Sequence, residues 1–468
     1  MEMTTYVWIR RPHLSSRFTA ALRVPFGSLP PKPPLHVGAA ATTAVVEWDV
    51  RTPPTDDRLW RLSGVNAENR DAARAVEIWR LHGIPNVQPM DGEDFGHGRL
   101  RWRACWTVPV FHLQPIGVFR SDGLRPVETA AHAEPDGPTV RKAARLAVRA
   151  LYALGLDFGV VDVASDAGRL AVVRVGPPER FEPVELWAEA IAQFDASLKE
   201  SFRPNGSVML GADPEFVLVN ERGRLVPGSR FVEKRGTVGC DAVRLKDGRF
   251  AFPLMELRPE PAVDPRGAVR SVRKALCAAA RQIRDPSCRW LAGGMPVRKT
   301  PLGGHLHFGG VWLNSHLLRA LDNFLALPLM LLEDEPSARR RPRYGALGDF
   351  RLKPYGFEYR TPASWLSSPR ATKAAFALAK LLATGHWRLF ERPLDDPELV
   401  ADFYAGRKDR LYDVVEQLWV CLADLPGYAD FESWLEPVRR MIRERRTWDG
   451  RADIRRLWRI PVDFPDVV

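Results

Sequence analysis

Hydrophobic and polar positions along the chain follow two periods, and each period predicts a different kind of element. Segments in which apolar residues recur with helical character are Asn66–Leu81, Arg141–Leu154, Pro183–Lys199, Arg266–Ile283 and a mainly helical tail from Ala371 to Arg446. Short apolar runs bounded by turn residues predict strands at Gly159–Val163, Leu170–Val175, Glu215–Val219 and Phe250–Leu257. Mixed in this order along the chain, these elements predict an α+β protein.

A stretch from Ser201 to Ser207, which contains Pro204, Asn205 and Gly206, separates two halves of the chain. Residues of these types favour loops, so we expect a linker between an N-terminal domain of residues 1–200 and a C-terminal domain of residues 207–468. A length of 468 residues suits two or three domains. The start of the first half, with its proline-rich stretch Pro30–Pro34, is expected to form a small α/β lobe with loops.

The composition is that of a globular protein, with 45% hydrophobic and 27% charged residues. A formal net charge of +11 and a pI near 9.6 could attract nucleic acid or another polyanion. The arginines are scattered along the expected helices and are not grouped with aromatic residues, so a nucleic-acid partner is not expected.

The cysteines form no CxxC pair, so the sequence predicts neither a zinc ribbon nor a disulfide framework. No apolar run follows basic residues at the N-terminus, and none approaches about 20 residues, so neither a signal peptide nor a membrane span is expected. These features predict a cytoplasmic protein with no membrane partner.

Polar residues interrupt apolar segments at four places in the C-terminal half. The polar residues are Asp213 with Glu215, Glu256, His305 with His307, and Glu358 with Arg360. In a strand, residues two positions apart share a face, so each pair can point into one cleft. Any single pair could be a solvated strand face. Together, and flanked by glycines, they predict a site and not a core.

Carboxylates are the ligands that Mg²⁺ prefers, and the arginine fork suits phosphate. Five arginines lie between or close to these motifs: Arg339, Arg340, Arg341, Arg343 and Arg351. Two imidazoles and a carboxylate could instead bind zinc, but a zinc hydrolase would not need these arginines. Transfer of a phosphoryl group needs positive groups around the spreading charge. The pattern therefore favours ATP chemistry over zinc chemistry.

Among the arginines, Arg351 and Arg360 are the first candidates to contact the transferred phosphoryl group. A run such as Arg339–Arg343 is usually a solvated loop, so we expect only one or two of its members to take part. We place Arg343 and Tyr344 near the nucleotide, because the segment Tyr344–Gly348 looks like a glycine-hinged loop that could cover it.

At these motifs the C-terminal half resembles the phage-type carboxylate-amine ligases, a branch of the glutamine synthetase and glutamate-cysteine ligase fold. The resemblance covers about Val208 to Trp365 and includes Gly239–Val243 and Arg343–Arg360. It implies a glutamine-synthetase-like antiparallel sheet with flanking helices, with ATP and Mg²⁺ as cofactors. Ala242 follows Asp241 where the family often has glycine, so that loop is expected to sit differently.

The resemblance also implies roles for individual residues. Glu215, Glu256 and Glu358 would hold the metal ions, and we add Asp213 to this set. His305 would be a further metal or phosphate ligand, and His307 would lie close to the nucleotide. Arg351 and Arg360 would stabilise the transferred phosphoryl group.

The N-terminal half resembles, more weakly, the ATP-grasp fold, through Val65–Pro85 and Ala153–Val163 with its closing strand. Active ATP-grasp enzymes usually end that strand with a glutamate and an asparagine that bind magnesium. This chain has Arg174 and Gly176 there, and a cation repels Mg²⁺. The resemblance therefore implies a degenerate ATP-grasp-like domain that recognises substrate or supports the other half, with Asp162 as a structural residue.

Together these features predict an ATP-dependent ligase that converts a carboxylate to an acyl phosphate and joins it to an amine. The acid and the amine would be an amino acid, a peptide or a cell-wall fragment, and Asp241 is a candidate base or cation anchor for the amine. A guanidino-type phosphotransferase of the same fold and a non-catalytic binding protein remain as alternatives. The oligomeric state is open, although glutamine synthetase relatives often form homo-oligomers.

Overall fold

The computed structural model describes residues 4–9, 16–29, 43–48, 59–66, 71–87, 104–120, 137–166, 169–202, 207–244 and 250–460. Helices and strands are mixed throughout these ranges, which confirms the α+β class. The chain divides into two compact units, Met1–Pro204 with Asn314–His316, and Asn205–Leu313 with Leu317–Val468. The proline-rich stretch Pro30–Pro34 and residues 203–206 of the expected linker lie outside the described residues.

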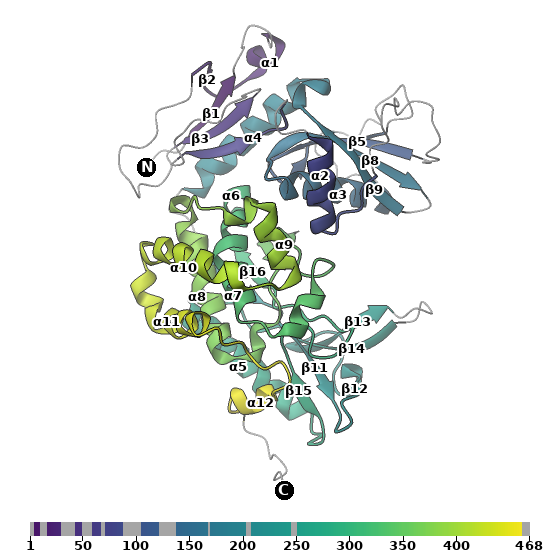
Figure 1. Cartoon of the computed structure of the whole chain (residues 1–468), viewed down its shortest axis with the longest axis vertical. Helices are drawn as coiled ribbons and strands as arrows, with labels where there is room; N and C mark the ends of the chain where they lie inside the picture. Colours follow the sequence, from purple (N-terminus) through teal and green to yellow (C-terminus); the bar gives the residue numbers. More distant parts are fainter. Residues whose placement is uncertain are drawn as a thin grey trace. The chain divides into compact units, whose positions relative to one another are not determined.

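The N-terminal unit contains two sheets (Figure 1). The strands of the first are β1 (Thr4–Ile9), β2 (Phe26–Gly27), β3 (Thr43–Trp48) and β4 (Trp60–Ser63). They pair in parallel in the order β2-β1-β3-β4. The strands of the second are β5 (Ala104–Phe111), β6 (Gln114–Pro115), β7 (Phe119–Arg120), β8 (Phe158–Asp166) and β9 (Arg169–Gly176). They pair antiparallel in the order β6-β5-β8-β9, and β7 also pairs with β5.

The helices of this unit are α1 (Ser16–Ala21), α2 (Ala72–Leu81), α3 (Pro138–Ala153) and α4 (Glu185–Ser201). Helix α2 begins after the predicted Asn66, because the side chain of Asp71 accepts hydrogen bonds from the N–H groups of Ala73 and Arg74 and caps it there. Helix α3 packs against β8 and β9. Its buried face includes Ala143, Ala147 and Leu151, which recur at the spacing of an amphipathic helix.

The C-terminal unit also contains two sheets, and both are antiparallel. Their strands are β10 (Met209–Ala212), β11 (Glu215–Val219), β12 (Leu225–Val226), β13 (Val238–Arg244), β14 (Phe250–Leu257), β15 (Arg289–Leu291), β16 (Leu306–Gly309), β17 (Phe350–Lys353) and β18 (Gly356–Tyr359). One sheet has the order β10-β16-β18-β17; the other has the order β12-β11-β14-β13, with β15 paired to β11. Asp213 and Pro214 connect β10 with β11, so the chain passes from one sheet to the other at these two residues.

The helices of this unit are α5 (Pro265–Gln282), α6 (Ser315–Leu321), α7 (Leu327–Leu331), α8 (Pro369–Gly385), α9 (Pro397–Ala405), α10 (Asp409–Ala423), α11 (Tyr428–Arg443) and α12 (Ile454–Leu457). The predicted helical tail is thus confirmed. Helix α8 is buried along most of its length and packs against α5 and α11 (Figure 1). The caps follow the sequence: Asp264 accepts hydrogen bonds from Arg266 N and Gly267 N at the start of α5, where Pro265 is the first helical residue.

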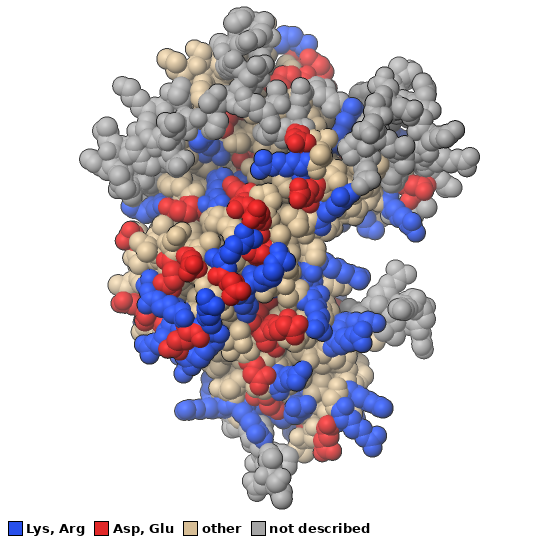
Figure 2. All heavy atoms as spheres, viewed as in Figure 1, with Lys and Arg blue, Asp and Glu red and all other residues tan. Residues whose placement is uncertain are grey.

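Charged side chains of both signs are interspersed over α10 and α11 on the face that Figure 2 shows. Glu416 of α10, for example, pairs with Arg439 and Arg443 of α11 at 3.1 and 2.9 Å. Many arginines of this region are therefore balanced by neighbouring carboxylates. Within the described ranges, no helix combines the length and the apolar character needed to cross a bilayer.

Candidate active site

The register of the two C-terminal sheets brings the sequence-predicted polar residues onto neighbouring strands. Where β11 pairs with β14, Glu215 lies opposite Glu256. Where β16 pairs with β18, His307 lies opposite Glu358, and Arg351 of β17 lies opposite the same Glu358 on its other side. Motifs that are far apart in the sequence therefore meet in pairs across adjacent strands.

Asp213 joins the two sheets, because it lies in the connection between β10 and β11. Its Oδ1 atom is 3.0 Å from His305 Nδ1, and its Oδ2 atom is 3.2 Å from His307 Nε2. Asp213, His305 and Glu358 each offer one potential ligand atom, and these atoms lie within 4.8 Å of one another. Three motifs thus contribute to a group that could hold a metal ion.

Glu358 is buried, with 1% of its side chain exposed, and lies among positive groups. The nearest nitrogen atoms are Lys353 Nζ at 2.9 Å, Arg360 Nε at 3.1 Å, Arg351 Nη1 at 3.4 Å and His305 Nδ1 at 3.6 Å. One carboxylate cannot neutralise so many cations. The positive charge in excess favours an anionic ligand such as a phosphate next to Glu358.

Glu215 and Glu256 are held close together although both are acidic. Glu215 accepts a hydrogen bond of 2.6 Å from the backbone N–H of Gly303, and burial raises its pKa above the ordinary value. Burial also raises the pKa of Glu256 to about 8, and the negative charges of Asp213 and Glu215 add to that rise. A divalent cation bound between such carboxylates would remove their mutual repulsion, so the arrangement suits metal binding.

The two histidines have a different electrostatic environment. Burial tends to raise the pKa of Asp213, but the hydrogen bonds and charges of His305 and His307 outweigh it and hold the pKa well below the ordinary range. Burial tends to lower the pKa of His305, yet the hydrogen bond to Asp213 and the charges of Asp213 and Glu215 leave it raised. Because of this raised pKa, His305 holds its second ring proton more tightly, and a metal ion that binds the ring would have to replace a proton.

The two arginines preferred as phosphate ligands, Arg351 and Arg360, both contact Glu358. Their side chains remain 54% and 29% exposed, so they can still reach a ligand. Arg340 differs, because it is buried and donates hydrogen bonds to the backbone oxygens of Thr361 at 2.7 Å and Arg360 at 3.3 Å. It supports the chain directly after β18 and does not present its guanidinium to solvent.

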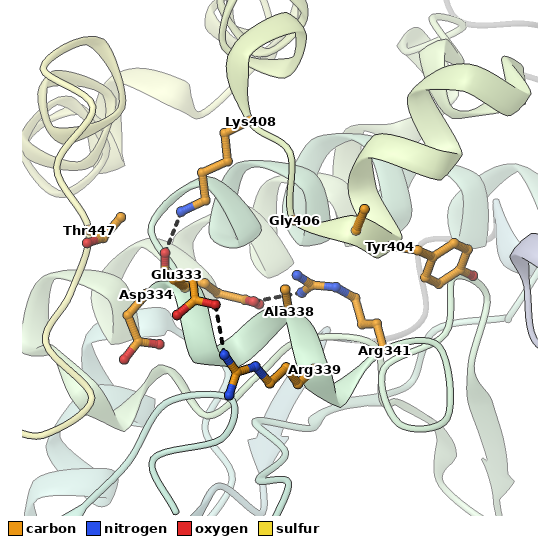
Figure 3. Close-up of a pocket in the computed structure, with 11 residues that line it drawn as sticks. Glu333, Asp334, Ala338, Arg339, Arg341, Tyr404, Gly406, Lys408 and Thr447 are labelled. Carbon is orange, nitrogen blue, oxygen red and sulfur yellow. Dashed lines mark hydrogen bonds and ion pairs between the residues drawn. The ribbon is translucent and has the colours of Figure 1, made fainter. Parts of the chain in front are cut away.

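Arg339 and Arg341 line a separate cavity of about 570 Å³, none of whose lining residues belongs to the carboxylate and imidazole group (Figure 3). Arg341 Nη1 is 2.7 Å from Glu333 Oε2, and both side chains are almost completely buried. Lys408 donates from Nζ to the backbone oxygens of Glu333 and, at 3.1 Å, of Leu331, the last residue of α7. The charges of Arg341 and Lys408 are thus paired within the protein, which suits a structural role for this part of the arginine run.

Arg343 and Tyr344 are both exposed, and the Arg343 guanidinium lies 5.6 Å from the centre of the Tyr344 ring. Among the described residues, neither makes a hydrogen bond or ion pair with the acidic group, so their contact with a nucleotide stays a prediction. Asp241 is exposed on β13, opposite Leu254 of β14. Its charge helps to raise the pKa of Glu256, after the larger effect of burial, so it lies at the edge of the acidic group.

Three residues that the sequence reasoning missed contact this group. Lys353 contacts Glu358, the hydroxyl of Tyr355 lies 2.9 Å from His307 Nδ1, and Arg258 forms an ion pair with Glu256. Two of them follow a predicted residue by two positions: Lys353 follows Arg351 within β17, and Arg258, directly after the end of β14, follows Glu256. The strand period could have identified these two, whereas Tyr355, in the turn between β17 and β18, has no such signal.

In the N-terminal unit, Asp162 of β8 lies opposite Arg174 of β9. Its Oδ2 atom pairs with Arg174 Nε, and its Oδ1 atom accepts a hydrogen bond of 2.8 Å from the hydroxyl of Thr107. Both oxygens of the carboxylate are thus engaged within the protein. This arrangement suits the structural role predicted for Asp162.

Comparisons with known proteins identify the C-terminal unit more clearly than the whole chain. No curated protein matches the sequence. A crystal structure of a bifunctional glutathione synthetase from Pasteurella multocida is similar at 10% identity with a TM-score of 0.34, over 54% of this chain and 51% of that one. A similarity this weak does not indicate an activity for this chain. The family described as phage phiEco32-like COOH.NH2 ligase-type 2 matches residues 210–460, more than half of the 468 residues, and the chain therefore belongs to this ligase family.

Proposed function

We propose that the protein is an ATP- and Mg²⁺-dependent ligase that forms an amide bond through an acyl phosphate. The observation that carries the proposal is the meeting of four acidic residues and two histidines beside the guanidinium groups of Arg351 and Arg360, which are at least partly exposed. The acidic residues are Asp213, Glu215, Glu256 and Glu358. Membership of a COOH.NH2 ligase family supports the reaction class, and the substrates would be a small-molecule or peptide acid and an amine.

The donor set of this site fits magnesium. Carboxylate oxygens are the preferred ligands of this ion. Burial raises the pKa of both Glu215 and Glu256, so a cation bound beside them would favour their charged forms. We assign Glu215, Glu256, Glu358 and Asp213 as the residues that hold the metal, with His305 as a further ligand. When bound, magnesium would neutralise and orient the phosphate oxygens of ATP.

The cations around Glu358 would act on the transferred phosphoryl group. Arg351 and Arg360 can donate paired hydrogen bonds to its oxygens and stabilise the charge that develops there. Lys353 adds a third positive group on the same strand as Arg351. Because Glu358 contacts all three side chains, it also holds them in place for this role.

The remaining chemistry follows from the poor reactivity of a free carboxylate, whose leaving group would be oxide. Attack of a carboxylate oxygen on the γ-phosphorus of ATP gives an acyl phosphate and ADP. The amine nitrogen then forms a bond to the acyl carbon, phosphate leaves, and the ammonium gives up a proton. Asp241, which is exposed at the edge of the acidic group, is our candidate to accept that proton or to anchor the amine.

For the other parts of the chain we propose a glutamine-synthetase-like fold for residues 207–468 and a degenerate ATP-grasp-like domain for residues 1–200. The pairing of Asp162 with Arg174 supports the second assignment, because a carboxylate held by a cation is a poor ligand for Mg²⁺. The N-terminal domain would recognise substrate or support the ligase domain. We place the protein in the cytoplasm.

The test is incubation of the protein with ATP, Mg²⁺ and a panel of acid and amine pairs, with ADP and phosphate as the readout. Hydroxylamine added in place of the amine should trap the acyl phosphate as a hydroxamate. An amide in the mass spectrum separates a ligase from a guanidino-type phosphotransferase. If the folded protein formed no ADP with any pair, and bound a nucleic acid or another polyanion equally well after Glu256→Ala, the proposal would be wrong and a binding protein would be favoured.

A further inference from the structure

An exposed loop, Glu233–Thr237, precedes β13 in the C-terminal unit and is tied to the acidic group by one side chain. Arg258 donates from Nη1 to the backbone oxygens of Lys234 at 3.2 Å and Gly236 at 3.3 Å. Its other terminal nitrogen, Nη2, forms the ion pair with Glu256. A single guanidinium group therefore bridges the loop and a carboxylate that we assign to the metal.

The bridge depends on a glycine. A Cβ atom at Gly239 would lie 2.1 Å from Arg258 Nη1 and 2.8 Å from the backbone oxygen of Lys234. Gly239 is opposite Glu256 in the pairing of β13 with β14. Any side chain at this position would displace the guanidinium from the space between the loop and Glu256, so glycine is required here for a close approach.

The loop also borders open space, where a ligand could reach it. Together with Arg230, Phe231 and the α5 residues Ala278 and Gln282, it lines a cavity of about 690 Å³. The loop thus forms part of the wall of an open cavity, and Arg258 holds the backbone oxygens of Lys234 and Gly236.

We propose that Arg258 is a positioning residue that couples the loop Glu233–Thr237 to the orientation of the Glu256 carboxylate. A substrate that contacts the loop would, through this link, change how Glu256 is presented to the metal. This inference rests on the proposed ligase function. The contacts that link the loop to Glu256 involve only residues of this chain, so the coupling between them can be measured without turnover.

The experiment is a double-mutant cycle read out by hydrogen–deuterium exchange of the peptide that covers residues 232–241. Arg258→Lys keeps a positive charge, but its single ammonium cannot bridge the two loop oxygens and Glu256 together. Glu256→Gln replaces the carboxylate that holds the guanidinium with a neutral amide, and exchange is measured above about pH 8, where Glu256 is charged. Each single variant is expected to speed exchange of this peptide about fivefold, and Glu256→Gln should add little in the Arg258→Lys background, because coupled residues are not additive.

Arg235→Lys is the matched control, since Arg235 lies in the same loop and makes no described contact with Glu256. It should leave both the exchange and the response to Glu256→Gln unchanged. Gly239→Ala keeps every charge and should reproduce the effect of Arg258→Lys, provided that circular dichroism shows a folded protein. Should Arg258→Lys fold poorly, Gly239→Ala takes its place in the cycle.

Additive effects in the cycle, or a loop whose exchange ignores Glu256→Gln, would overturn the coupling. Because the measurement uses neither ATP nor substrates, absence of ligase activity would not affect it. Conversely, ADP formation by a protein with an additive cycle would leave the proposed function intact and remove only the role of Arg258.

Discussion

The buried pair of Arg341 and Glu333 allows a quantitative test of whether the arginine run Arg339–Arg343 supports the fold or binds phosphate. Arg341→Met removes the guanidinium and keeps a long apolar side chain. The guanidinium carbon also lies 4.9 Å from the centre of the Phe403 ring, so the apolar replacement can keep part of that packing. If the structural role is right, this variant should lose stability and not nucleotide binding.

The magnitude follows from burial. The two side chains are only 2% and 4% exposed, and the ionic atoms are 2.7 Å apart. With an effective dielectric constant of about 20, their attraction is about 6 kcal/mol, which largely offsets the cost of burying both charges. Removing one partner of a buried pair leaves the other charge uncompensated, which costs about 3–5 kcal/mol.

Thermal unfolding at pH 7, followed by tryptophan fluorescence, measures the effect. For a unit of this size about 1 kcal/mol shifts Tm by roughly 2–4 °C, so Arg341→Met should lower Tm by about 6–20 °C. The double variant Glu333→Leu with Arg341→Met should be more stable than Arg341→Met alone.

Arg339→Met is the matched control, because Arg339 pairs with Glu335 at a similar distance, 3.0 Å, but with side chains that are 63% and 80% exposed. Exposed pairs contribute about 0.5 kcal/mol or less, so its Tm should hardly change. Equal effects of Arg341→Met and Arg339→Met would refute the reasoning. So would a stable Arg341→Met protein that no longer binds nucleotide.

The other predictions concern the acidic group and the N-terminal unit. Glu358→Gln should lower ADP formation by at least about 100-fold at saturating ATP and Mg²⁺, because it removes a charge that holds both the metal and the phosphate-binding cations; a near-normal rate in a coupled enzyme assay would contradict this. In metal-free protein, burial raises the pKa of Glu256 to about 8. The proton on Glu256 contributes to the free energy of unfolding. This contribution is complete below the pKa of an ordinary glutamate and is lost as the pH rises through about 8. Tm should therefore fall more steeply between about pH 5 and pH 8 in the native protein than in Glu256→Gln. Identical pH slopes would argue against the raised pKa. Asp162→Asn should leave ADP formation within about twofold, since Thr107 and Arg174 already engage that carboxylate; a larger loss would show that the N-terminal unit takes part in catalysis.

Much of the local structure could be read from the sequence. The strands Glu215–Val219 and Phe250–Leu257 have the predicted bounds, because their apolar runs and flanking turn residues act locally. Helix α5 begins one residue before the predicted Arg266, at Pro265, a residue that suits the first helical position. The predicted start of helix α2 was less accurate, because the cap at Asp71, and not the periodicity, determines where this helix begins.

The roles of the arginines could not be read in the same way. A run of positive residues has the same sequence signature whether each side chain is exposed, buried or bound to a ligand. Burial separates Arg340 and Arg341 from Arg339 and Arg343, and burial depends on segments such as Thr361 and Glu333 that no local pattern connects to them. Tyr355 was missed because its partner, His307, is defined by strand pairing, whereas the strand period could have identified Lys353.

The sequence alone thus determined which residue types are available for chemistry and, through the strand period, which pairs can share a face. The tertiary structure decided that Glu215 faces Glu256, that Glu358 lies among cations, and that Arg258 bridges a loop to the acidic group. The physical reason is that periodicity and capping act within a few residues. Register, burial and electrostatic coupling arise only when distant strands pack together and exclude water.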